Sequence, residues 1–80
     1  MKMTAMDKLN DVFRMVFDDE TLSVSETTTA NDVDGWDSLT HINLIMAVEA
    51  LFRIQFSSKD LGSLRNVGDL LGIIESKGSA

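Results

Sequence analysis

The stretch Gly35-Trp36-Asp37-Ser38-Leu39 joins a polar segment to a long apolar run near the middle of the chain. Aspartate is a preferred N-cap residue, so Asp37 is predicted to cap a helix whose first turn contains Ser38. The unpaired backbone N–H groups and the positive end of the dipole at a helix N-terminus favour an anion. A serine hydroxyl at this position therefore suits a phosphate ester.

A helix is predicted to follow over about residues 38–52, and the chain has no proline that would kink it. Plotted at about 100° per residue, its apolar side chains fall into two arcs. The broad arc is expected to face the core and holds Leu44, Ile45, Val48, Leu51 and Phe52. The smaller arc, here called the stripe, holds Leu39, Ile42 and Met46. Glu49 separates it from the broad arc, and Arg53 and Asn43 border it.

The sequence leaves two interpretations of the stripe open. Exposed apolar side chains rimmed by polar groups often mark an interaction surface, which would make the stripe a docking patch for partner proteins beside Ser38. Alternatively, Ile42 and Met46 pack beneath the loop formed by residues 18–37. The periodicity alone does not favour either interpretation.

Three further helices are expected from apolar periodicity and capping residues, over residues 5–17, about 58–62 and 67–76. Residues 18–37 lack periodicity and are predicted to form a long loop, with Leu22 and Val24 directed inward. The expected capping pairs are Thr4 with Asp7, Ser57 with Asp60, and Asn66 with Asp69. The expected core opposite the 38–52 helix comprises Leu9, Phe13, Phe17, Phe56, Leu64, Leu70, Leu71 and Ile74.

The composition excludes several classes of function. The chain has no cysteine, so it has neither disulfides nor thiolate metal sites, and any thiol chemistry requires an attached group. Thirteen acidic and seven basic residues give a net charge of −6, which argues against nucleic acid as a partner. No metal site is expected, because an EF-hand alignment on Gly35 puts Ala30 and His41 at ligand positions that require carboxylates. Without a signal peptide or membrane span, the chain is expected to be cytoplasmic.

The motif from Gly35 to Leu39 and the helix after it resemble the modification site of acyl carrier proteins. The resemblance implies an all-α four-helix bundle with a short third helix, formed by residues 1–80 as a single, monomeric carrier domain with flexible ends at 1–3 and 77–80. It implies that Ser38 carries covalent 4′-phosphopantetheine from coenzyme A, flanked by Asp37 and Leu39, and that the chain is not an enzyme. Docking would use Leu39, Ile42, Met46, Glu49 and Asp34. The implied partners are a phosphopantetheinyl transferase, a loading ligase or acyltransferase, and a ketosynthase or other acyl-using enzyme.

The chain departs from carriers of primary fatty-acid synthesis along the helix after the serine. The serine is followed by Thr40, His41 and Asn43, whereas that group usually has several carboxylates along this helix. Glu49 is nearly alone here, and Ala50 and Leu51 occupy positions where further acids would be expected, so the resemblance implies docking that depends more on apolar contact. Gly35-Trp36 is similar to carriers of polyketide-like, specialised acyl pathways, and a D-alanyl carrier remains an alternative. An unmodified helical adaptor that binds a partner through the stripe is the alternative from another class.

Two aromatic residues near the motif carry separate expectations. Trp36 is predicted to anchor the loop against the bundle rather than to stack on a ligand. His41, the only histidine, is expected to be a solvated side chain, the alternative being a contact with the phosphate of the prosthetic group. A hydrolytic role for Ser38 with His41 is rejected, because the flanks lack a Gly-x-Ser-x-Gly elbow.

Overall fold

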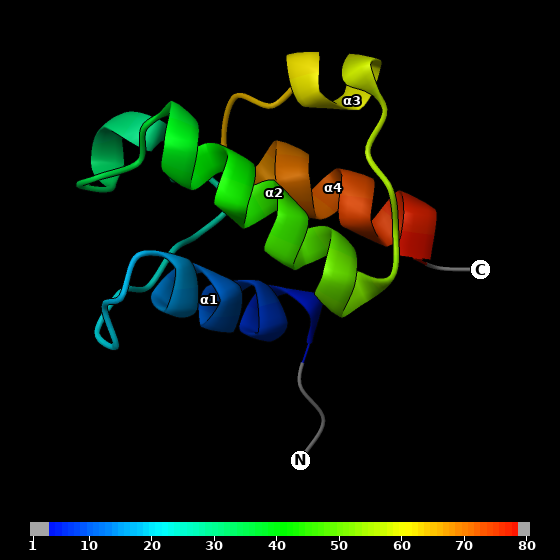
Figure 1. The fold of residues 1–80 in the computed structure, drawn as a ribbon. Coiled ribbons are helices and arrows are strands. Elements are labelled where there is room, and N and C mark those ends of the chain that lie inside the picture. The colour runs from blue at the N-terminus through cyan, green and yellow to red at the C-terminus, as the bar shows by residue number, and fades with distance from the viewer. Residues whose placement is uncertain (1–3, 79–80) are drawn as a thin grey trace.

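The computed structural model describes residues 4–78, which form four α-helices, one 3₁₀ helix and no strand (Figure 1). The predicted bundle with a short third helix is therefore confirmed. The details differ from expectation in three places. The first helix ends at Val16 rather than at residue 17, residues 30–32 within the loop form a 3₁₀ turn, and the last helix continues to Gly78. The ends predicted to be flexible include residues 1–3 and 79–80, which lie outside the described residues. The elements are α1 (Ala5–Val16), η1 (Ala30–Asp32), α2 (Ser38–Phe52), α3 (Ser58–Gly62) and α4 (Val67–Gly78).

The helices begin where their capping residues predict. At α1, the backbone N–H of Asp7 donates to Thr4 Oγ1 at 3.1 Å, and Thr4 N–H donates to the Asp7 carboxylate at 3.0 Å. Ser57 and Asp60 form the same reciprocal pair at α3. At the start of α4, Asp69 N–H donates to the side-chain oxygen of Asn66 at 2.8 Å. These bonds satisfy backbone donors that a helix N-terminus otherwise leaves unpaired.

The core lies where α2 and α4 both pack against α1 (Figure 1). Most residues predicted for the core are fully or partly buried, and Phe13, Leu9 and Leu44 are among the largest fully buried side chains. The prediction for Leu51 was wrong, because this side chain is 51% exposed. It lies at the edge of the buried arc and lines a shallow groove between α1 and α2 beside Met15 and Ala47, where no third element covers it.

The long loop is held against the bundle by hydrogen bonds from α1 and α4. Asn10 on α1 accepts from Val24 N–H at 2.7 Å and donates to Val24 C=O at 3.4 Å. Just after Val24 in the loop, Thr28 C=O accepts Val67 N–H at 2.9 Å and Glu26 C=O accepts Gly68 N–H at 2.8 Å. Val24 is buried and Leu22 is partly buried, so their predicted inward direction is confirmed. The loop therefore brings the residues before α2 into a defined position.

Candidate functional site

Ser38 is the first residue of α2, and its side chain is exposed. Asp37 is the N-cap, as predicted, and its carboxylate accepts the backbone N–H of Thr40 at 3.0 Å. The hydroxyl of Thr40 accepts Asp37 N–H at 2.8 Å in return. The capping box thus uses Asp37 and Thr40 and does not involve the Ser38 hydroxyl. Thr40 was not predicted to take part, although the Asp-x-x-Thr spacing is a variant of the capping-box pattern.

A tight turn precedes the capped helix and is bonded to it. Trp36 N–H donates to Val33 C=O at 3.3 Å, and Gly35 adopts a φ of +84°. A positive φ is the conformation that glycine adopts without steric cost, which accounts for this residue at the third position of the turn. The Thr40 hydroxyl donates to Gly35 C=O at 2.7 Å. The turn and the first turn of α2 therefore form one hydrogen-bonded unit around Ser38.

Trp36 anchors this unit to the core, as predicted. Its ring meets Phe13 edge-on at a centroid distance of 5.2 Å and Phe17 at 6.0 Å. The indole Nε1–H donates to His41 Nδ1 at 3.1 Å, and the two rings stack with an interplanar angle of 23°. The expectation that His41 is a solvated side chain was wrong, because the ring is half-buried against the indole. A shallow surface recess beside Ser38 is lined by Ala30, Trp36, Asp37, Ser38 and His41.

The charge near Ser38 is negative, and its groups differ in how they are engaged. The backbone N–H of Thr40 holds the pKa of Asp37 below its ordinary value, so this carboxylate is ionised at neutral pH. Asp32 accepts the backbone N–H of Thr29 at 2.9 Å as part of the η1 cap. Asp34 is exposed. Of Asp32, Asp34 and Asp37, only Asp37 directly adjoins the serine in the chain.

The stripe on α2 is open to solvent. Leu39, Ile42 and Met46 are 68%, 56% and 62% exposed, so the alternative in which Ile42 and Met46 pack beneath the loop was wrong. Glu49, predicted to be a docking residue, is half-buried and accepts Phe56 N–H at 2.9 Å. This bond fastens the segment after α2, so Glu49 has a structural role in the fold whether or not it meets a partner.

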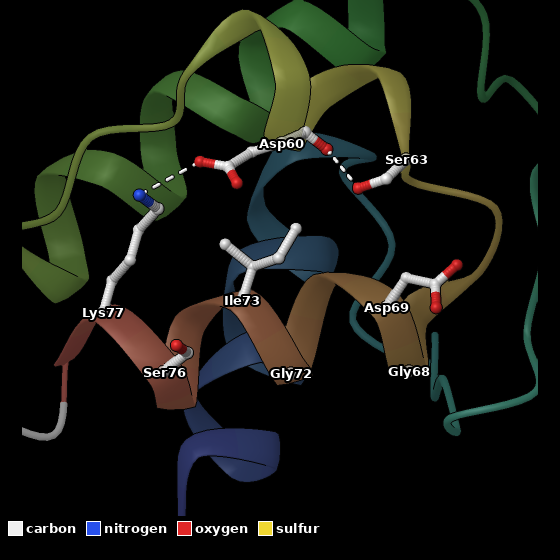
Figure 2. A pocket seen from close by; sticks show the side chains of 8 residues that line it. All are labelled: Asp60, Ser63, Gly68, Asp69, Gly72, Ile73, Ser76 and Lys77. Carbon is white, nitrogen blue, oxygen red and sulfur yellow. Dashed lines mark hydrogen bonds and ion pairs between the residues drawn. The ribbon is translucent and has the colours of Figure 1, made fainter.

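A cavity of about 400 Å³ lies between α3 and α4, away from Ser38. Figure 2 shows Lys77 near the end of α4 reaching Asp60 on α3, with Nζ 3.0 Å from the carboxylate, while the Ser63 hydroxyl donates to Asp60 C=O. The cavity wall is largely polar. Within residues 4–78, no cluster of histidine and acidic side chains has the arrangement of a metal site. No helix in that range has both the length and the apolar character needed to cross a membrane.

Comparison with known proteins supplies the family. No family model matches the chain. The fold superposes on the solution structure of a holo acyl carrier protein from Geobacter metallireducens with a TM-score of 0.89 and 43% identity, covering 96% of this chain and 88% of that one. A candidate mitochondrial acyl carrier protein of Schizosaccharomyces pombe is 42% identical over 48 residues, which are 60% of this chain. The match spans 42% of that relative, less than half its length. Because this chain and that carrier are 43% identical over nearly the full length of both, the protein belongs to the acyl carrier protein family.

Proposed function

We propose that this chain carries an acyl group as a thioester on a 4′-phosphopantetheine arm esterified to Ser38. The observation that carries the proposal is the exposed Ser38 hydroxyl at the first position of α2, between two residues whose polar groups already bond each other. The recess beside it offers room for the start of an arm, and Asp37 is the only carboxylate in its lining. Because the chain contains no cysteine, the thiol that holds the acyl group must come from the arm.

The attachment needs a phosphopantetheinyl transferase with magnesium and coenzyme A. The Ser38 hydroxyl loses its proton and forms a bond to phosphorus, while the pyrophosphate bond of coenzyme A breaks and the nucleotide leaves. Members of the family are carriers rather than catalysts, so the domain presents its cargo and partner enzymes act on it. Tethering raises the effective concentration of the acyl group at each partner, which is the physical advantage of a carrier.

The test is an intact-mass measurement after incubation with a promiscuous transferase and coenzyme A. We expect one phosphopantetheine on the wild type and none on Ser38→Ala. Ser58→Ala is the matched control, because Ser58 is also the exposed first residue of a capped helix, α3, and its loss should leave modification intact. An unmodified wild type, or a modified Ser38→Ala, would contradict the proposal and favour the adaptor alternative.

We further propose that the stripe on α2 is the docking surface for the transferase, for a loading ligase or acyltransferase, and for a ketosynthase or other acyl-using enzyme. Its support is the exposure of Leu39, Ile42 and Met46 on the helix that begins at Ser38. Burying such side chains in an interface contributes about 25 cal/mol per Å² of apolar surface. Asp34 and Glu49 would form a thin acidic rim, with little other charge along α2.

Docking is tested by comparing two methionines that are equally accessible. Met46→Asp should slow transfer of phosphopantetheine by the transferase at least tenfold, because about 1.4 kcal/mol of lost apolar contact corresponds to that factor. Met15 on α1 is 67% exposed and lies outside the stripe, so Met15→Asp should leave the rate within about twofold of wild type, as a small change in free energy requires. Equal rates for both variants would refute the assignment of the docking surface.

We also propose a pathway and a location for the chain. The small number of carboxylates on α2 and the Gly35-Trp36 pair support a specialised, polyketide-like acyl pathway over primary fatty-acid synthesis. A D-alanyl carrier is the alternative, which mass measurement of the cargo on the native protein would distinguish. A monomeric carrier domain acting in the cytoplasm is the proposed state of the chain.

A further inference from the structure

The stacked pair of Trp36 and His41 separates two recesses on the surface of the bundle. One recess contains Ser38 and is lined on one side by His41. The other is smaller, about 80 Å³, mostly apolar, and extends from the same pair to Leu64 and Leu70. Both recesses share Ala30, Trp36 and His41 in their linings. The imidazole therefore stands where an arm attached to Ser38 would leave the helix.

The hydrogen bond from Trp36 determines which imidazole nitrogen can donate. An indole N–H is only a donor, so His41 Nδ1 must be an unprotonated acceptor, and the proton of the neutral ring lies on Nε2. Nδ1 is the only imidazole atom with a hydrogen-bond partner among the described residues. Since no buried polar side-chain atom within residues 4–78 lacks a partner, Nε2 must reach solvent. The ring thus presents a single oriented N–H donor at the surface.

Ser38 and His41 are three residues apart on α2, and residues at this spacing lie on the same side of a helix with Cβ atoms about 5–6 Å apart. Ser38 and His41 also line the same recess, so a phosphate joined to Ser38 Oγ would have the imidazole as a neighbour. We propose that His41 Nε2–H donates a hydrogen bond to the phosphodiester of the arm and so positions the arm against the recess. The proposal rests on the proposed function, because it requires an arm on Ser38.

The contact connects the arm to the core through three side chains. The phosphodiester is bound by His41, His41 is held by Trp36, and Trp36 packs on Phe13 of α1. The charged groups that line the two recesses are Asp37 and Arg65. Removal of the imidazole would therefore break the link between the phosphodiester and Trp36 without removing a charged group from either recess.

The test is ³¹P NMR of the holo protein, with the arm first verified by intact mass. A hydrogen bond donated to a phosphate oxygen changes the shielding of the phosphorus, so removal of His41, the only histidine, should change the ³¹P chemical shift at a fixed pH. His41→Ala, with folding checked by urea denaturation, should show this change. The matched control is His41→Ala with Asn43→His, which places the imidazole about 200° around the helix at an exposed position and should leave the shift as it is in His41→Ala.

Each outcome discriminates. An identical ³¹P shift in the wild type and in His41→Ala, both shown by mass to carry the arm, would overturn the role of His41 and leave the proposed function standing. A wild-type shift restored by the displaced histidine would also overturn it. Failure to attach an arm at all would refute the proposed function and this inference together.

Discussion

Gly68 allows the long loop to approach the N-terminus of α4, and Gly68→Ala should separate them. A Cβ at this position would lie 2.9 Å from Glu26 C=O, 3.2 Å from the Asn66 side-chain oxygen and 3.3 Å from Glu26 Cβ. The first contact is with backbone, which has no rotamer with which to move aside. To relieve it, the loop must move away, and the bonds from Val67 N–H to Thr28 C=O and from Gly68 N–H to Glu26 C=O must lengthen.

The expected loss is worked from these contacts. An added methyl in a well-packed position costs about 1–3 kcal/mol, and each of the two hydrogen bonds contributes about 1 kcal/mol. The greater helix propensity of alanine offsets up to about 1 kcal/mol. The free energy of unfolding should therefore fall by about 2–4 kcal/mol, measured as a lower urea midpoint with an unchanged m-value. For a domain of this size, a loss at the lower end of that range corresponds to a fall in Tm of roughly 10 °C.

Gly72 provides the matched control within the same helix. A Cβ at Gly72 meets nothing within 4 Å, so Gly72→Ala should raise stability by about 0.5–1 kcal/mol. The two substitutions are chemically identical and differ only in what the methyl group meets. If Gly68→Ala proved as stable as Gly72→Ala, the close approach of the loop to α4 would be refuted.

Two further variants test the ends of α2 and α3. Arg53 closes α2 with a φ of +56°, so Arg53→Gly should raise the free energy of unfolding by about 1 kcal/mol in urea denaturation, whereas Arg53→Ala should not. The Ser57 N–H, with Lys77 nearby, holds the pKa of Asp60 below its ordinary value. Because folding lowers this pKa, the stabilisation is complete above about pH 3.9 and is lost as the pH falls through the lower folded value. Asp60→Asn should therefore lower the urea midpoint at pH 7, and the difference from wild type should shrink below about pH 4; a pH-independent difference would contradict this.

The sequence was sufficient to predict where the helices begin and where Ser38 lies. Caps are short-range signals, since the hydrogen bonds of Thr4 with Asp7 and of Ser57 with Asp60 span only three residues. The same locality explains the position of Ser38, because Asp37 caps the helix that starts at the next residue. Apolar periodicity likewise predicted the core side of α2, which is buried at Leu44, Ile45 and Val48.

The surroundings of individual side chains were decided by tertiary packing. Leu51 lies within the apolar arc of α2 on a helical projection. It is nevertheless exposed, because it lines the open groove between α1 and α2 and is not buried between them. The burial and hydrogen bonding of His41 depend on Trp36. Trp36 is in turn positioned by its contact with Phe13 on α1, about two dozen residues before it in the chain. Periodicity defines the direction of a side chain about its own helix axis, whereas its burial and hydrogen-bond partner depend on which distant segment packs there. The serine at the helix start and the anchoring role of Trp36 were thus available from the sequence, whereas the hydrogen bond between Trp36 and His41 came only from the folded chain.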